Sequence, residues 1–389
     1  MLCLLLVAGA CAAPDLSPPQ LDCAAAILID PETRQVLYEK NADERRPPAS
    51  LTKMMTGLLV AESGDLSRVV EVSASAAAVG ETSMRLSAGE RISLYDLLLG
   101  ALLPSANDAA AASAEAVDGS IEAFGEHMSR RAAELGMTRT RFVNPHGLHA
   151  EEHISTARDL AVLGAELMAR PELRAIVSMK QATVSWPGHD SPRVLVNRNQ
   201  LLERWDACDG IKTGYTRQAG RCLAASAFVD GWRLIGVVLG SKDAWSDAEM
   251  LLQWGFNSFY KVALISSAVT MATIEVRGGV QQTVAARAAE DVIAVLPRTA
   301  RPEDPVLLDT SCRAPVQTGQ VVGRVAVTMP DGTTRTVDLV ALADVAQSPW
   351  AMILEQRWSL GVLAAVLALA VGVLAHGAIA EAVGARRSG

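Results

Sequence analysis

Residues 48–53 read Pro-Ala-Ser-Leu-Thr-Lys, and the segment from Leu51 to Ala61 that overlaps them carries apolar residues at helical spacing. Prolines just before such a segment predict a helix that begins close to Ser50. Ser50 and Lys53 then project from the same face of the first turn, where a hydroxyl and an amine can act as nucleophile and base. The free N–H groups and positive potential of a helix N-terminus suit a developing oxyanion, and together with burial they lower a lysine pKa. Taken alone, however, this spacing more often marks a serine cap and a solvated lysine.

Two further short motifs carry chemistry. Ser105-Ala106-Asn107 follows Pro104 in a break between two expected helices, where a hydroxyl and an amide can turn into a cleft, although Ser105 also suits a simple helix cap. Lys212-Thr213-Gly214 ends an expected strand. There an ammonium and a hydroxyl can hold a carboxylate, and the glycine lets another backbone approach closely. An exposed strand end with a solvated lysine is the structural alternative.

The three motifs occur in the order Ser-x-x-Lys, Ser-x-Asn, Lys-Thr-Gly, which is the motif set of serine penicillin-binding proteins and serine β-lactamases. The chain closely resembles the D-alanyl-D-alanine carboxypeptidases, the low-molecular-mass penicillin-binding proteins. The resemblance covers roughly residues 22 to 345 and rests on Ala24 to Asp30 with Thr33-x-x-Val-Leu-Tyr, Pro48 to Lys53, Asn197-Arg198-Asn199-x-Leu-Leu and Asp209 to Thr216. It implies an α/β (α+β) fold of the penicillin-binding and β-lactamase-like transpeptidase type.

The resemblance also implies a role for each matching residue. It makes Ser50 the nucleophile toward the terminal D-Ala-D-Ala amide of peptidoglycan stem peptides, with Lys53 as its proton acceptor and Ser105 as a proton relay. Asn107 would hold the peptide, Lys212 and Thr213 would bind its C-terminal carboxylate, and Gly214 would allow the close approach of the backbone. The backbone N–H groups of Ser50 and Tyr215 would form the oxyanion hole. β-Lactams are then covalent inhibitors, and no cofactor is implied. His146 and Arg198 also resemble family positions near the cleft, but a lone histidine or arginine in a loop is more often structural, so both are left outside the expected site.

Two other functions share these residues. A serine β-lactamase carries the same motifs, but it needs an efficient deacylating base and usually has neither a second domain nor a membrane tail. A cell-wall binding or scaffold protein can keep the fold without catalysis, although every nucleophilic and carboxylate-binding residue is present here. The carboxypeptidase interpretation is therefore preferred.

The composition excludes several partners and sites. The 389 residues carry a net charge of −8 without any run of basic residues, so the chain has no footprint for nucleic acid. The six cysteines form no Cys-x-x-Cys pair and no zinc-like spacing with histidine, and a metal site is not expected. Cys208 and Cys222 flank one expected hairpin without facing each other, and they are predicted to be buried free thiols.

The two ends of the chain predict where it resides. Residues 1–13 are apolar and small and end in Ala-Cys-Ala-Ala, which is typical of an export signal. Residues 359–380 hold no Asp, Glu, Lys or Arg, and these 22 residues can cross a ~30 Å hydrocarbon layer as one helix. Arg386 and Arg387 follow within the tail 381–389 and favour a cytoplasmic C-terminus. We therefore expect a protein of the cell membrane whose catalytic domain lies on the extracytoplasmic side.

Between these ends the pattern predicts two domains. A serine D,D-peptidase catalytic domain is expected over 22–264, with strands at both ends of it and helices between them. A small β-rich domain is expected over 265–345, followed by a linker over 346–358. The expected helices are 94–103, 106–116, 120–135, 157–169 and 245–260, and the expected strands are 24–29, 36–39, 210–214, 222–229, 232–239, 269–276, 321–329 and 335–340.

Overall fold

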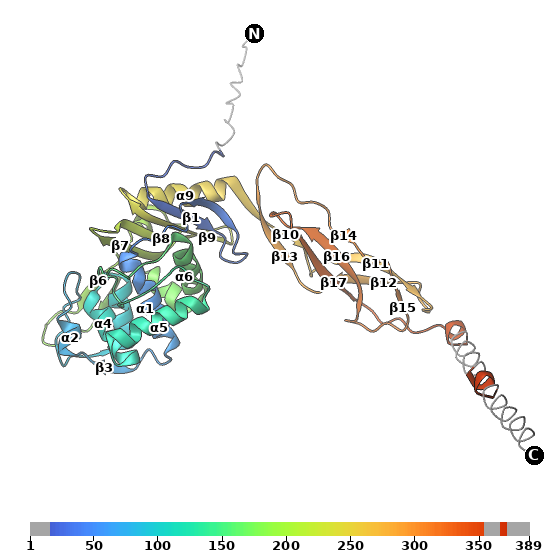
Figure 1. Ribbon diagram of the computed structural model, residues 1–389, viewed down its shortest axis with the longest axis horizontal. Helices are drawn as coiled ribbons and strands as arrows, with labels where there is room; N and C mark the ends of the chain where they lie inside the picture. Colours follow the sequence, from blue (N-terminus) through green and yellow to red (C-terminus); the bar gives the residue numbers. More distant parts are fainter. Residues whose placement is uncertain (1–15, 354–365, 372–389) are drawn as a thin grey trace, which may run out of the picture. The chain divides into compact units, whose positions relative to one another are not determined.

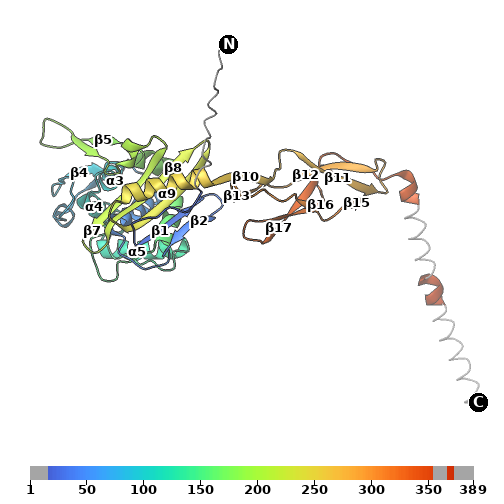
Figure 2. The same cartoon turned by 90° about the horizontal axis from the view of Figure 1, so that it is seen from above.

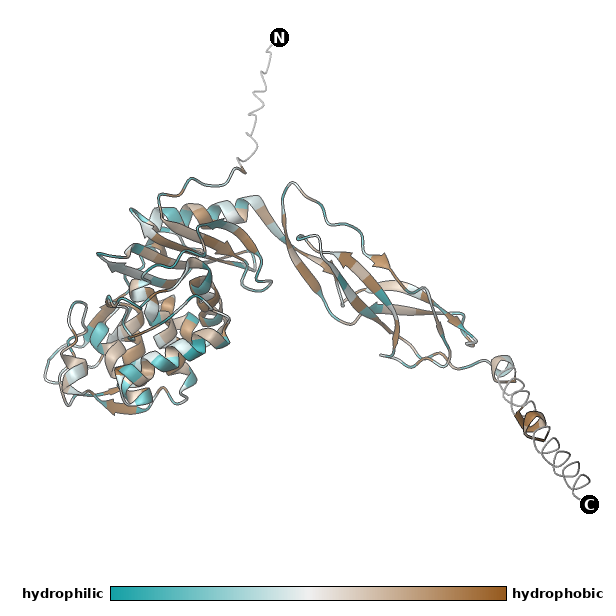
Figure 3. Cartoon of the chain, viewed as in Figure 1, coloured by the Kyte–Doolittle hydropathy of each residue, from teal (hydrophilic) through white to brown (hydrophobic). Residues whose placement is uncertain are grey.

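The computed structural model describes residues 16–353 and 366–371, and the chain divides into two compact units, Met1–Tyr260 and Lys261–Gly389 (Figure 1). The division falls before the expected boundary at 264 because strand β10 (Phe259–Ile265) follows helix α9 directly and pairs with a strand of the second unit. The expected export signal, and the expected membrane segment apart from 366–371, lie outside the described residues. Residues 366–371 are helical and hydrophobic (Figure 3). None of the described helices has both the length and the apolar character to cross a membrane.

A five-stranded antiparallel sheet of order β2-β1-β9-β8-β7 forms the base of the first unit. Its strands are β1 (Ala25–Ile29), β2 (Val36–Lys40), β7 (Cys208–Thr216), β8 (Gly220–Val229) and β9 (Trp232–Ser241). Alternate residues of a strand point to opposite faces, and in β1 both faces are buried. Ile27 belongs to the core that the sheet shares with the main group of helices, whereas Leu28 belongs to the core under α9. The sheet is therefore covered on both sides.

The helices divide between these two faces. Helix α9 (Ala244–Ser258) lies along one face, and the short α8 (Leu201–Arg204) adds Leu201 and Leu202 to the core under it. The other helices lie on the opposite side (Figures 1 and 2). They are α1 (Lys53–Glu62), α2 (Ala74–Ala77), α3 (Leu94–Leu102), α4 (Asn107–Asp118), α5 (Ile121–Glu134), α6 (Ala157–Ala169) and α7 (Pro171–Val177). Two small hairpins complete this unit: β3 (Val69–Glu71) with β4 (Arg91–Ser93), and β5 (Gln181–Val184) with β6 (Arg193–Val196).

The sequence expectations for this unit are confirmed element by element. The first hairpin, the four middle helices, the three later strands and the last helix all form within a few residues of their predicted bounds. The helix expected near Ser50 begins as a 3-10 turn, η1 (Ala49–Thr52), and continues as α1. The expected α/β architecture, with strands at both ends of the unit and helices between them, is likewise confirmed. Cys208 and Cys222 are buried free thiols, as predicted, and burial raises the pKa of each to about 11.

The second unit is an all-β domain, which also agrees with the sequence. Its main sheet has the order β14-β16-β17-β12-β11-β15, and β10 pairs separately with β13. The strands are β11 (Thr270–Arg277), β12 (Thr283–Ala288), β13 (Val292–Pro297), β14 (Val306–Leu307), β15 (Ser311–Arg313), β16 (Val321–Thr328) and β17 (Thr334–Ala341). Strands β16 and β17 form the hairpin that Pro330-Asp331-Gly332 predicts.

Candidate active site

The turn that carries Ser50 is held from several directions. Ala49 has a positive φ of 50°, a conformation that an L-residue adopts only when its surroundings enforce it. Thr52 Oγ1 donates to the Ala49 carbonyl at 2.7 Å and lies 2.7 Å from His153 Nε2. Gly147 packs so closely that a Cβ there would lie 1.9 Å from the Ala49 oxygen, so only glycine fits. The turn before α1 is thus fixed before any substrate arrives.

Lys53 lies at the start of α1, and its side chain is fully buried. Its Nζ lies 3.0 Å from Ser50 Oγ, 2.7 Å from Asn107 Oδ1 and 2.8 Å from the His146 carbonyl oxygen. Burial, and then the positive charges of Lys212 and Arg198, hold the pKa of this amine well below its usual value. The three contacts of this amine are thus two carbonyl-type acceptors and one hydroxyl.

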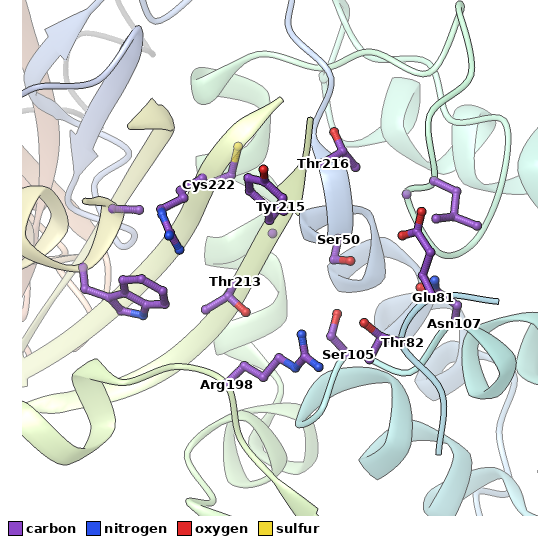
Figure 4. Close-up of a pocket in the computed structure, with 16 residues that line it drawn as sticks. Ser50, Glu81, Thr82, Ser105, Asn107, Arg198, Thr213, Tyr215, Thr216 and Cys222 are labelled. Atoms are coloured by element: carbon purple, nitrogen blue, oxygen red, sulfur yellow. The ribbon is translucent and has the colours of Figure 1, made fainter. Parts of the chain in front are cut away.

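The Ser105-Ala106-Asn107 motif lies where α3 gives way to α4. Ser105 has a positive φ of 68° and is not the helix cap, since Ala106 takes that position without a side-chain bond. Its hydroxyl points into the cleft toward Ser50 (Figure 4). Asn107 joins two parts of the site, because it accepts from Lys53 while its Nδ2 donates to the Gly80 carbonyl at 2.9 Å. The cap alternative for Ser105 is therefore wrong.

Strand β7 forms the opposite wall of the cleft. A Cβ on Gly214 would lie 3.1 Å from the Ser50 nitrogen and 3.2 Å from the Leu51 nitrogen, so the glycine permits the close approach that the motif predicts. Thr213, Gly214 and Tyr215 face the cavity. Lys212 does not, because it is fully buried and its Nζ donates to the Thr213 carbonyl at 3.0 Å. Burial, and then the charge of Arg198, lower its pKa to about 7.

These walls enclose a cavity of about 330 Å³ with Ser50 between them (Figure 4). Six of the eight expected site residues line it: Ser50, Ser105, Asn107, Thr213, Gly214 and Tyr215. The other two, Lys53 and Lys212, are buried behind the cavity surface. Within the described residues, no cluster of His, Cys, Asp and Glu that could hold a metal ion occurs.

Several cavity residues were not expected from the sequence. Arg198, which lies outside the expected site, lines the cavity beside Ser105 and lowers the pKa of both buried lysines (Figure 4). Glu81 and Thr82 line it from the loop that Asn107 binds, and Arg221 and Trp245 line it beyond β7. The Asn-Arg-Asn segment was the one signal that could have identified Arg198; the others stand in no motif.

His146 contributes through its backbone. Its carbonyl oxygen accepts from Lys53, while its imidazole is buried and accepts the Leu148 N–H on Nδ1 at 3.2 Å. Burial, and then the charge of Lys53, lower the imidazole pKa to about 3, so the ring stays neutral at ordinary pH.

Taken together, the geometry suits acyl transfer. A hydroxyl lies beside a buried amine whose pKa is lowered, β7 at Gly214 comes close to the backbone nitrogens of Ser50 and Leu51, and cationic groups line the cavity on the β7 side. A peptide that ends in a free carboxylate fits this distribution of charge.

Comparisons with known proteins agree with the geometry. The family model for D-alanyl-D-alanine carboxypeptidases matches residues 12–243, and the model for the C-terminal domain of penicillin-binding protein 5 matches residues 259–347. The chain is 38% identical over 328 residues to the D-alanyl-D-alanine carboxypeptidase DacC of Escherichia coli, covering 79% of this chain and 80% of that protein. It is 33% identical over 310 residues to DacF of Bacillus subtilis, covering 77% and 79%. Penicillin-binding protein 5 from Haemophilus influenzae has a similar structure, with a TM-score of 0.70, 31% identity, and coverage of 85% of this chain and 99% of that one.

Proposed function

Because this chain belongs to the D-alanyl-D-alanine carboxypeptidase family of serine peptidases, we propose that Ser50 is the nucleophile that removes the terminal D-Ala from peptidoglycan stem pentapeptides. The observation that carries the proposal is the buried Lys53 amine, 3.0 Å from Ser50 Oγ and otherwise bound only to acceptors. Such an amine takes the Ser50 proton as Oγ attacks the penultimate D-Ala carbonyl.

The reaction then balances in two steps. The Oγ–C bond forms, the C–N bond breaks, and the proton held by Lys53 passes to the departing D-Ala nitrogen with Ser105 as relay. Water hydrolyses the resulting ester and restores the Ser50 hydroxyl. The backbone N–H groups of Ser50 and Tyr215 stabilise the oxyanion in both steps, and such a donor typically contributes ~10²–10³ in rate.

Binding of the substrate carboxylate is assigned to the β7 side of the cleft. The Thr213 hydroxyl and the Arg198 guanidinium line the cavity there, while Lys212 supplies positive charge from beneath. Asn107 holds the peptide, and Gly214 keeps β7 against the nucleophile. β-Lactams acylate the same serine, which accords with the penicillin-binding family of the chain.

Ser50→Ala tests the nucleophile. This variant is expected to lose D-Ala release from a pentapeptide stem, measured by mass spectrometry, and covalent labelling by penicillin, with an unchanged melting temperature. Ser178→Ala is the matched control, because the Ser178 hydroxyl bonds only the Ala175 carbonyl, far from the cavity. Release of D-Ala by the Ser50 variant at the wild-type rate would exclude Ser50.

The lifetime of the penicilloyl-enzyme separates this function from the β-lactamase alternative. A carboxypeptidase should hold the acyl group for minutes or longer, because its site is adapted to a peptide and not to rapid release of penicillin. Turnover of penicillin within seconds would instead favour a β-lactamase.

We further propose export and membrane attachment. Residues 1–13 have the composition of an export signal, and residues 359–380 have the length and apolar character of one membrane helix. The arginines that follow favour a cytoplasmic tail over 381–389. This places the catalytic unit outside the cell membrane, where peptidoglycan lies.

A further inference from the structure

Charge is unevenly distributed around the nucleophile. Thr213 and Arg198 lie on one side of Ser50, and Glu81 lies on the other, next to Asn107 (Figure 4). Arg221 also lines the cavity, with its guanidinium over the rings of Tyr215 and Trp245 at 6.0 and 5.6 Å. The cavity is therefore cationic along its β7 side and carries a carboxylate on the opposite side.

Glu81 is available for a ligand. The residue is exposed, and within residues 16–353 no lysine or arginine nitrogen lies within ion-pair distance of its carboxylate. Its charge still reaches the centre of the site, because it raises the pKa of Lys53 against the larger effect of burial. An unpaired carboxylate facing a substrate cleft can bind a cation at little cost in desolvation.

The loop that carries Glu81 is also held in place. The neighbouring carbonyl of Gly80 accepts from Asn107 Nδ2 at 2.9 Å, and that of Thr82 accepts from the Asn107 N–H at 2.7 Å. The buried Asp108 carboxylate then binds the Ser83 hydroxyl and the backbone N–H groups of Met84 and Leu86. Glu81 itself has a positive φ of 67°, in keeping with a backbone fixed from both sides. Its carboxylate is thus presented by a rigid support.

The direction of the substrate follows from these charges. A D-Ala-D-Ala peptide places its terminal carboxylate at the cationic side and its penultimate carbonyl at Ser50, so the residue before D-Ala-D-Ala must run toward Glu81. We propose that Glu81 determines specificity by binding a free amino group on the side chain of that preceding residue. Glu81 also repels the terminal carboxylate and so disfavours the reversed orientation. This inference rests on the proposed carboxypeptidase function and extends it to the class of stem peptide.

Two synthetic peptides test the proposal with the purified full chain. Nα-acetyl-Lys-D-Ala-D-Ala has a free side-chain amine, whereas Nα,Nε-diacetyl-Lys-D-Ala-D-Ala has none. The native enzyme should prefer the free amine by about three- to fivefold in kcat/KM for D-Ala release, the magnitude of a partly exposed ion pair, and the preference should shrink in 0.5 M salt.

Two variants and one control locate the effect. Glu81→Gln changes the charge near Lys53 for both peptides alike, so the ratio of the two kcat/KM values is the readout. This ratio should fall to about one in Glu81→Gln and should reverse in Glu81→Lys. Glu126→Gln removes the same charge from an exposed position of α5 outside this cavity, and it should keep the native preference. An unchanged melting temperature shows that each variant is folded.

The outcomes are separable. Equal kcat/KM for the two peptides in the native enzyme, or an unchanged ratio in Glu81→Gln, overturns the role of Glu81 while the carboxypeptidase function stands. Absence of D-Ala release from both peptides overturns the proposed function itself.

Discussion

At the scale of single residues, the site contains two buried lysines whose pKa values are lowered by burial. Lys53 has no charged partner of opposite sign within hydrogen-bond distance, and its three contacts are a hydroxyl and two carbonyl-type oxygens. Lys212 is equally buried, with a pKa lowered to about 7. The motif chemistry therefore depends on desolvation, which the residue types alone do not specify.

These pKa shifts predict the pH dependence of the reaction. Lys53 must be neutral to accept the Ser50 proton, so kcat/KM rises with pH as the Lys53 ammonium group deprotonates. Lys212 must be charged to attract the substrate carboxylate, so kcat/KM falls as pH rises above about 7. A bell-shaped profile of D-Ala release between pH 5 and 10 is expected, since kcat/KM reports the free enzyme.

In the profile of kcat, the falling limb should move to higher pH, because a bound carboxylate stabilises the charged form of Lys212. A kcat/KM that stays constant from pH 7 to pH 10 would contradict the role assigned to Lys212.

At the scale of elements, the site forms where three structures meet: the turn η1, the start of α4 and the strand β7. Gly214 decides how closely β7 approaches η1, because a side chain there would meet the backbone nitrogens of Ser50 and Leu51. Asn107 fixes the position of the start of α4, since it binds both Lys53 and the loop at Gly80. The spacing between these elements, and not their individual stability, sets the geometry of the nucleophile.

Gly214→Ala tests this packing. The added methyl group must push β7 away from η1 by a few tenths of an ångström, which displaces the oxyanion N–H groups from Ser50. Misplacement of this kind can reduce kcat by up to about 10²-fold, and acylation by penicillin should fall in parallel.

The melting temperature of Gly214→Ala should change little, because β7 keeps its pairing with β8. Gly231→Ala is a useful comparison: it lies in the turn between β8 and β9 with open space around it, and it should leave kcat unchanged although its positive φ lowers stability. Native activity in Gly214→Ala would show that the close approach is not required.

At the scale of the whole molecule, the chain combines a catalytic unit with an all-β unit and a hydrophobic C-terminal segment. Two clusters of buried hydrophobic residues lie within the first unit, and residues 366–371, within the expected membrane segment, are helical. The proposed attachment to the membrane thus lies in a part of the chain remote in sequence from every proposed catalytic residue.

Removal of residues 360–389 tests this assignment. The shortened chain is expected to fractionate with the soluble proteins of the exported compartment and to keep the kcat/KM of the full chain for a pentapeptide stem. Retention in the membrane fraction after a high-salt wash would contradict a single C-terminal anchor.

The sequence by itself determined the order of the three motifs, the helices and strands that carry them and the class of reaction. These signals are local, since hydrophobic periodicity, turn residues and a four-residue motif are readable within one or two helical turns. The sequence also indicated that position 214 is a glycine because another backbone segment approaches it. It did not indicate which segment this is.

Only the tertiary structure decided that Lys53 is wholly buried, that Lys212 lies behind the cavity, and that Arg198 and Glu81 face it from opposite sides. Burial, electrostatic potential and the walls of a cleft arise from segments far apart in the chain: Lys53 meets Asn107 across 54 positions and His146 across 93. Such contacts leave no trace in the spacing of neighbouring residues, because the free energy of placing a charge depends on everything packed around it.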